Sequence, residues 1–553
     1  MFLRKLTVTR GTETYTYLKV VESVRANGRI VQRTLVNLGN VSTWPAENLR
    51  TLIHLLQSFL HEDGPLPSES LGQIRLRHPR CLGPYLAASQ MWEALHLDTV
   101  LAQQWRGRRL DPRALACAKA LVLTRLVAPR SKAATWELVR DTVWIPGVAG
   151  TALPLHAYYR TLDALHETKA ALEKSVHGQV MTLFNRDVSM VFYDLTSSYF
   201  EGQGCEQARH GYSREHRPDL VQIELGLLVD ADGLPIGHEV FDGNVKDVST
   251  VLGTLDRLQQ EFGIRRCIFV GDDGMASAAN LATLAARGYE YITSVALGVS
   301  KDVPPMLQAI LPPWCWPALT PTLRLRPLET REGVRYIGSY NPARAAHTRQ
   351  TRRRHLRTCV DGLQALQAGP KPHARKKTPA ETVTAADRLV RRQGCQAWIQ
   401  VQLVDHHLTW QIDGAALRAS HRLDGVLVLQ TNAATLTDRE VAQGYRSLWR
   451  VENAFRHLKD GLRLRPIRHW TDAHVLGHIF VCVLAYLLER LMDQQLERGK
   501  VQLTARSALE KLASLTVAEL TYEDIMVRRR SELTPIQRQI FTALGLPEVP
   551  ELW

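Results

Sequence analysis

The sequence contains no Cys-x-x-Cys pair, and its eight cysteines are scattered along the chain. Structural zinc sites and disulfide frameworks both depend on cysteines at short, regular spacings. The scattered positions therefore argue against both kinds of cross-link. We expect reduced thiols and a cytoplasmic protein.

Long hydrophobic runs are also missing. The longest, residues 475–488, spans 14 residues and includes His478, whereas a membrane-spanning helix needs roughly 20 apolar residues. The N-terminal residues 1–8 lack the apolar centre of a signal peptide. We expect no association with a membrane, and we interpret residues 475–488 as a buried core helix.

Acidic residues are fewer than basic ones. The 553 residues include 69 Lys and Arg against 55 Asp and Glu, which gives a formal net charge of +14. Such a positive field favours a polyanionic partner, nucleic acid before an anionic membrane. A chain of this length can bury a large core and is expected to divide into several domains.

Residues 188–295 show a change from helical to extended periodicity. The pattern predicts a strand, two hairpin strands, a helix, a strand, a helix and a strand. This is the element order of a ribonuclease-H-like core, in which the first and fourth strands are neighbours. Asp194 lies on the first strand and Asp272 at the end of the fourth, so we expect the two carboxylates to be adjacent.

The predicted fold class is α/β, in several regions distinguished by their periodicity. An N-terminal hairpin is indicated by two alternating runs joined at Ala26-Asn-Gly-Arg29. The ribonuclease-H-like core is interrupted by an insertion that is part basic helix and part β. The predicted regions are an N-terminal β-hairpin and linker (1–72), a helical region (73–186), the first part of the core (187–299), the inserted domain (300–435), the second part of the core (436–495) and a C-terminal helical region (496–553).

One amphipathic helix is predicted over residues 437–462, beginning with a Thr-x-x-Glu capping box. Tyr445, Glu452 and Lys459 recur every seven residues, a spacing that drifts only about 20° per step. These three side chains are therefore expected to lie in one line along the helix. Glu452 by itself is equally consistent with an ordinary helix salt bridge.

Three carboxylates, Asp194, Asp272 and Glu452, form an oxygen-only set of the kind that Mg²⁺ or Mn²⁺ prefers. Two such ions would suit an in-line phosphoryl transfer. Asp194 is hard to explain structurally, because an unpaired carboxylate on an apolar strand is costly. Asp273 follows Asp272 directly, so either residue can serve as the second ligand.

Two stretches are strongly basic. The connectors within the helical region, 106–109 and 129–132, are consistent either with DNA contact or with solvated loops on a packing scaffold. Residues 344–377 contain ten Lys and Arg against one acidic residue, Asp361. A solvated helix face is one interpretation; we favour a phosphate-binding surface because of the net charge.

Taken together, these motifs resemble the DDE transposases of bacterial insertion sequences, in the branch with the signature Y-(2)-R-(3)-E-(6)-K. Tyr445, Glu452 and Lys459 match the spacing of that signature. Residues 191–196 and 270–275 resemble its first-Asp strand and second-Asp segment. Each motif is weak alone, and the combination is specific.

Two positions depart from the family pattern. Leu448 stands where the signature has Arg, so the phosphate contact must come from another residue. Arg446, Arg450 and Arg456 are candidates, and Arg456 shares the helical stripe of Glu452. Asp273 replaces a residue that is commonly basic.

The resemblance implies a transposase that binds terminal inverted repeats and target DNA and performs metal-dependent cleavage and strand transfer. It implies two Mg²⁺ or Mn²⁺ ions per site, a homodimer in the synaptic complex, and a cytoplasmic location with the nucleoid. The helical region would bind the transposon end. The alternatives are a non-catalytic, domesticated DNA-binding protein, or a ribonuclease-H-like nuclease without strand transfer.

The resemblance also assigns residues. Asp194, Asp272 and Glu452 would be the catalytic metal ligands. Trp449 would either stack on an extruded base or pack at the helix margin. The DNA contacts that it implies are Tyr445, Lys459, Arg456 and Arg450. The basic stretch adds further expected contacts, which are Arg352, Arg353, Arg354, Lys376 and Lys377.

Overall fold

The structure is a computed structural model with two compact units, which are described separately. Unit 1 comprises Met1–Arg77 with Glu519–Arg528, and unit 2 comprises His78–Ala518 with Arg529–Trp553. The finer six-part division of the chain stays a prediction. The description covers all residues except 1, 11–12, 27–28, 41–74, 77–78, 185–189, 246, 265–266, 273–275, 296–305, 308–311, 369–377, 406, 523–524 and 551–553.

Unit 1 contains an antiparallel sheet of order β1-β2-β3. β2 (Glu13–Ala26) and β3 (Arg29–Asn40) form the predicted hairpin, with Ala26 opposite Arg29. The sequence prediction missed the first strand, β1 (Phe2–Arg10), which pairs with β2 along its whole length. The predicted linker lies outside the described residues.

The centre of unit 2 is a mixed sheet whose core has the order β10-β9-β6-β7-β8. β6 is parallel to β9 and antiparallel to β7, and β9 is parallel to β10. This order confirms the predicted ribonuclease-H-like core, with the first and fourth strands adjacent. The strands are β6 (Met190–Tyr199), β7 (Gln222–Asp230), β8 (Pro235–Asp242), β9 (Ile268–Gly271) and β10 (Glu290–Val295).

The insertion extends this sheet instead of forming a separate layer. β16 (Val426–Thr431) pairs antiparallel with β10 and carries the outer strands beyond it, in the order β13-β12-β11. The extended sheet therefore has nine strands among the described residues. The outer strands are β11 (Ala318–Thr320), β12 (Leu323–Arg331) and β13 (Val334–Tyr340), preceded by a 3-10 turn, η1 (Pro313–Cys315).

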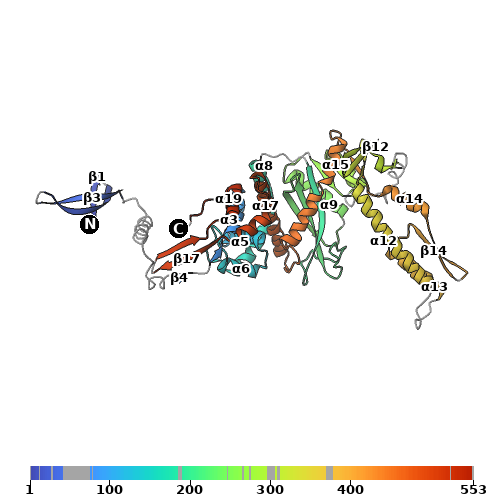
Figure 1. Ribbon diagram of the computed structural model, residues 1–553, viewed down its shortest axis with the longest axis horizontal. Helices are drawn as coiled ribbons and strands as arrows, with labels where there is room; N and C mark the ends of the chain where they lie inside the picture. Colours follow the sequence, from blue (N-terminus) through green and yellow to red (C-terminus); the bar gives the residue numbers. More distant parts are fainter. Residues whose placement is uncertain are drawn as a thin grey trace. The chain divides into compact units, whose positions relative to one another are not determined.

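The rest of the insertion has a small hydrophobic core of its own. The long helix α12 (Pro342–Gln367) contacts α13 (Pro379–Arg392) and a two-stranded hairpin, as Figure 1 shows. Cys359 and Leu363 on α12 are buried in this core. The hairpin strands are β14 (Ile399–Val404) and β15 (His407–Ile412), and α14 (Gly414–Leu423) follows them.

Helices cover both faces of the core sheet, and the alternation of β6 decides which side chains meet which helices. Tyr193 belongs to the hydrophobic cluster formed with α9 (Asp247–Gln260) and α10 (Ala278–Ala286). Phe192 belongs to the cluster formed with the helices on the other face. Asp194 shares the side of Phe192, because alternate residues of a strand point the same way.

Helix α17 (Asp472–Arg498) lies at the centre of the largest hydrophobic cluster. It is long and apolar enough to cross a membrane, but 89% of its most apolar window is buried inside the protein. The prediction of a buried core helix is therefore confirmed, although the helix has 27 residues and extends well beyond 475–488. It packs against α5 (Ala114–Val127) and α7 (Leu155–Glu167). The helices of this region are α3 (Gly83–Ala94), α4 (Leu97–Gln104), α5 (Ala114–Val127), α6 (Lys132–Asp141), α7 (Leu155–Glu167) and α8 (Lys169–Phe184).

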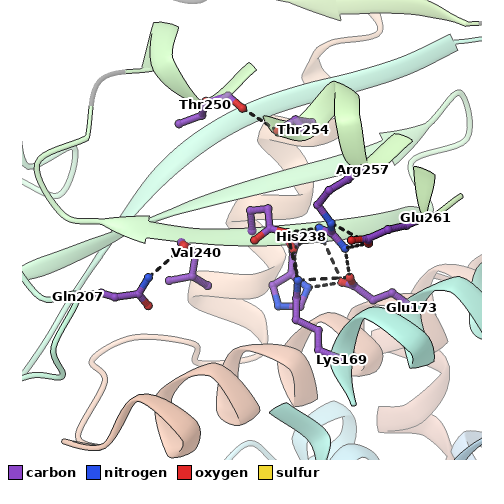
Figure 2. A network of polar contacts seen from close by, with 10 residues as sticks. Lys169, Glu173, Gln207, His238, Val240, Thr250, Thr254, Arg257 and Glu261 are labelled. Atoms are coloured by element: carbon purple, nitrogen blue, oxygen red, sulfur yellow. Dashed lines mark hydrogen bonds and ion pairs between the residues drawn. The ribbon is translucent and has the colours of Figure 1, made fainter. Parts of the chain in front are cut away.

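A buried network of charges ties α8 to the edge of the sheet. Figure 2 shows the Glu173 carboxylate beside both His238 on β8 and Arg257 on α9. Its oxygens lie 2.6 Å from His238 Nδ1, 2.7 Å from Arg257 Nη2 and 3.4 Å from Lys169 Nζ. Burial alone would raise the pKa of Glu173, but Lys169, His238 and Arg257 together hold it below its ordinary value.

The C-terminal region is not wholly helical, so that part of the prediction is wrong. A hairpin of β17 (Thr516–Tyr522) and β18 (Ile525–Arg530) lies between α18 (Ala505–Leu512) and α19 (Pro535–Leu544). β17 pairs with the short strands β4 (Arg75–Leu76) and β5 (Arg80–Cys81). Its Thr, Val and Tyr residues favour strand over helix.

Candidate active site

The predicted single helix over 437–462 is divided into segments. The capping box is confirmed: Glu440 Oε2 accepts from the Thr437 amide at 2.8 Å, and the Glu440 amide donates back to the Thr437 hydroxyl at 3.3 Å. The Ser447 hydroxyl bonds to the carbonyl of Gln443, a contact that bends helices. The segments are α15 (Asp438–Arg446), α16 (Trp449–Arg456) and a π-helical turn, η2 (His457–Gly461).

Asp194 and Asp272 follow matching positions on adjacent strands. Phe192 lies opposite Val270 in the parallel pair β6–β9, and two residues further along the chain are Asp194 and Asp272. Asp194 Oδ1 accepts from the Leu195 amide at 2.8 Å. The side of β6 that carries Asp194 is the side covered by α16.

The charge environment relates all three predicted carboxylates. Burial, followed by the charges of Asp272 and Glu452, raises the pKa of Asp194 to about 7 against the opposing effects of the Leu195 amide and Arg214. An ordinary aspartate has a pKa near 4. Asp272 and Glu452 are therefore close enough for their charges to act on Asp194.

These carboxylates fit a divalent metal by their chemistry. They offer oxygen ligands, which Mg²⁺ and Mn²⁺ prefer, and a cation would relieve the repulsion that raises the Asp194 pKa. Within the described ranges, no three His, Cys, Asp or Glu side chains are already drawn together as a coordination sphere. Asp273 lies outside the described residues, so the choice between Asp272 and Asp273 stays open.

A cavity of about 590 Å³ lies beside Glu452. Tyr445, Arg446, Trp449 and Glu452 line it from α15 and α16, and Arg344 lines it from α12. Trp449 is 56% exposed, so it does not pack at the helix margin. Arg344 belongs to the basic stretch 344–377, but no local motif marks it as a site residue. Arg344 and Glu452 line the same cavity although more than 100 residues separate them in the sequence, so local patterns could not predict their proximity.

The three arginines considered as replacements at the Leu448 position have different surroundings. Arg446 lines the cavity beside Glu452. Arg450 Nη1 lies 4.0 Å from Asp232 in the β7–β8 turn, away from that cavity. Arg456 is exposed on α16. Leu448 itself is buried in the core.

Lys459 does not continue the line of Tyr445 and Glu452. Its ammonium pairs with Glu215 and donates to Thr196 Oγ1 at 2.5 Å, and it lines a second cavity. The expectation of one line through the three side chains is therefore wrong. The π-helical turn places Lys459 off the α-helical repeat on which that expectation rested.

The arginines of α12 separate into two kinds. Arg353 and Arg354 are exposed. The Arg352 side chain is only 9% exposed, pairs with Asp424, and lies 5.3 Å from the Trp398 ring. Arg352 thus holds α12 against the segment before β16 and is already engaged within the protein. The other predicted contacts of the insertion, Lys376 and Lys377, lie outside the described residues.

Residues 187–488 match the family described as "Transposase DDE domain", and residues 3–64 match "IS1634 family transposase, N-terminal domain". The first match spans more than half of the chain and includes Asp194, Asp272 and Glu452. A cryo-EM structure of the piggyBac transposase synaptic complex with hairpin DNA is similar at a TM-score of 0.37 and 9% identity, covering 78% of this chain and 79% of that one. No curated protein matches the sequence.

Proposed function

Because the chain belongs to the DDE transposases of bacterial insertion sequences, we propose that it binds the terminal inverted repeats of its own element and moves that element by metal-dependent DNA cleavage and strand transfer. The observation that carries this proposal is that Asp194 and Asp272 follow matching positions on adjacent strands, and that α16, which carries Glu452, packs against the first of these strands. The charges of Asp272 and Glu452 help to raise the pKa of Asp194. These acids come from two strands and a helix, and a shared charge environment has no other evident use in the fold.

Asp194, Asp272 and Glu452 would hold Mg²⁺ or Mn²⁺. When two such ions are bound, they supply an activated attacking oxygen and a stabilised leaving oxygen for phosphoryl transfer. Arg344 and Arg446 line the cavity next to Glu452, where their charges would hold the phosphates beside the scissile bond.

Around this centre, other residues would orient the DNA. The Tyr445 hydroxyl and the exposed indole of Trp449 offer a hydrogen bond and a stacking surface in the same cavity. Arg456, Arg353 and Arg354 are exposed cations available to more distant phosphates.

This activity requires two kinds of partner, DNA and a second copy of the chain. The helical region over 73–186 would bind the transposon end, with target DNA entering from the side of the carboxylates. A homodimer would pair two ends in a synaptic complex in the bacterial cytoplasm.

The proposal is tested by a cleavage assay on DNA that carries the element's own terminal repeats. We expect cleavage with Mg²⁺ or Mn²⁺ and none with EDTA. Asp194→Asn and Glu452→Gln should each lower the rate by about a thousandfold or more, because each removes a metal ligand. Glu497→Gln on the exposed end of α17 is the matched control and should cleave normally. Full activity of Asp194→Asn would overturn the assignment.

Two further comparisons complete the test. Asp272→Asn and Asp273→Asn, assayed side by side, identify the second ligand as the one whose loss abolishes cleavage. A pre-nicked terminal repeat is then offered plasmid DNA. Joining of its 3′ end supports a transposase, whereas cleavage without joining would indicate a nuclease.

A further inference from the structure

A second cavity, of about 1090 Å³, lies between the α5–α6 connector and the segment that follows the π-helical turn. Its lining contains five arginines and two lysines but a single acidic residue, Asp460. The proposed function assigns no role to any of these cations. An excess of this size in one cavity favours an anionic ligand.

Three of the seven cations have carboxylate partners inside the protein. Lys459 and Arg465 both pair with Glu215, and Arg468 pairs with Glu201 at 2.8 Å. The other four have no carboxylate partner in the described part of the chain. They are Arg125, Arg130, Lys132 and Arg463.

The floor of the cavity is made of basic side chains held in place by hydrogen bonds. Lys132 is 3% exposed, and its Nζ lies 2.7 Å from His478 Nδ1. Arg125 donates to the carbonyls of Arg130 at 2.9 Å and Leu462 at 3.3 Å, which directs its guanidinium into the same region. Burial and the charge of Arg125 lower the pKa of Lys132 well below its ordinary value. The lowered pKa favours the neutral form of Lys132, and an anion bound beside it would favour the charged form instead.

The cavity is connected to the region of the carboxylates through Lys459. Lys459 lines it while donating to Thr196, which lies two residues after Asp194 and so on the same side of β6. Trp470 also lines the cavity and is 73% exposed. An exposed indole beside fixed cations is the combination that binds unpaired nucleotides, by stacking on the base and neutralising the phosphate.

We propose that this cavity binds an unpaired stretch of the DNA strand held at the carboxylates, with a backbone phosphate on Lys132, Arg125 and Arg463 and a base on Trp470. This inference rests on the proposed function, because it takes the strand to continue from Asp194 past Lys459. It assigns the connector after α5 and the segment 463–470 to one DNA-binding surface.

The test measures DNA binding by the full-length protein in EDTA, so that cleavage plays no part. The probe is a duplex bearing the element's terminal repeat with a short unpaired 3′ end, compared with the fully paired duplex. Arg130→Gln and Arg463→Gln alter exposed side chains and should each flatten the dependence of log Kd on log salt by about 1. Trp470→Ala should weaken binding of the unpaired probe about tenfold and leave the paired duplex unaffected.

Matched controls use similar side chains outside the cavity. Arg538→Gln on α19 and Trp314→Ala, which is also exposed, should bind as the unaltered protein does. Unchanged salt dependence in both cavity arginine variants would overturn the inference, as would displacement by polyglutamate in preference to DNA. Normal binding by these variants, in a protein whose cleavage still requires Asp194, defeats this inference alone. Cleavage by Asp194→Asn defeats the proposed function instead.

Discussion

Asp194 is expected to destabilise the metal-free fold, although the proposed chemistry needs its carboxylate as a metal ligand. Burial and two neighbouring carboxylates raise its pKa from 3.8 to about 7. A raised pKa means that the folded state binds the proton more tightly than the unfolded state. The free energy of unfolding in the absence of metal therefore falls as pH rises from 3.8 to about 7, and the loss is complete above that range.

A pH series in EDTA tests this conflict. The unaltered protein should lose stability between pH 4 and 7 in part through Asp194, and Asp194→Asn should show a smaller loss because its amide does not ionise. Denaturant unfolding at each pH measures the difference. Added Mg²⁺ should restore stability above pH 7 in the unaltered protein and much less in the variant. Identical pH dependence of the two proteins would contradict a strained carboxylate at this position.

Single residues also mark where sequence reasoning succeeds and where it cannot. The adjacency of Asp194 and Asp272 could be predicted, because strand order alone determines which strands meet. The engagement of Arg352 with Asp424 and of Lys459 with Glu215 could not. Those partners are 72 and 244 residues away, and nothing in the local pattern distinguishes a paired cation from a free one.

At the scale of elements, some features of the helical region that carries Glu452 could be predicted from the sequence and others could not. Its beginning could be read from the sequence, because the Thr437–Glu440 capping box is a local motif. Its interruption between Arg446 and Trp449 and its π-helical turn could not be predicted. Apolar residues at three- and four-residue steps face the core whether or not the helix is continuous. The consequence is functional, since Tyr445 and Glu452 face one cavity and Lys459 faces another.

The charge network around Glu173 joins α8 to β8, the edge strand of the sheet, and to α9. Glu173→Gln should lower the free energy of unfolding by about 3 kcal/mol, because it removes the buried carboxylate that Arg257 and Lys169 share. Both cations then keep only more exposed carboxylate partners, chiefly Glu239. Glu261→Gln is the control: Glu261 also pairs with Arg257, at an i,i+4 spacing, but it is about one-third exposed. Its removal should cost no more than about 0.5 kcal/mol.

The pH dependence of the same network has a defined sign. The pKa of Glu173 is held below its ordinary value, so its contribution is present above pH 4.5 and is lost as pH falls toward the lower pKa of the folded state. Denaturant unfolding of the unaltered protein and of Glu173→Gln should therefore converge in acid. A constant difference at every pH would show that the carboxylate charge is not what stabilises α8 against β8 and α9.

For unit 2 as a whole, one part of the insertion is continuous with the core sheet and the other part packs mainly on itself. β16, β13, β12 and β11 continue the core sheet, so this half is part of one cooperative structure. The half formed by α12, α13 and the β14–β15 hairpin has a hydrophobic core of its own. The sequence predicted that the insertion contains basic helix and β-strands, but strand pairing across more than 100 residues is not legible in local periodicity.

This difference predicts two distinct responses to the same kind of substitution. Leu429 is buried in β16 between β10 and β13, and Leu363 is buried in the small core on α12. Leu429→Ala and Leu363→Ala should each cost about 2–5 kcal/mol of local stability. Hydrogen exchange followed by mass spectrometry should show Leu429→Ala losing protection through β10 and β9, into the strands that carry the carboxylates. Leu363→Ala should lose it only in α12, α13 and the β14–β15 hairpin. Lost protection in β9 and β10 of Leu363→Ala would contradict the separation, and would make the basic helix α12 part of the same cooperative unit as Asp194.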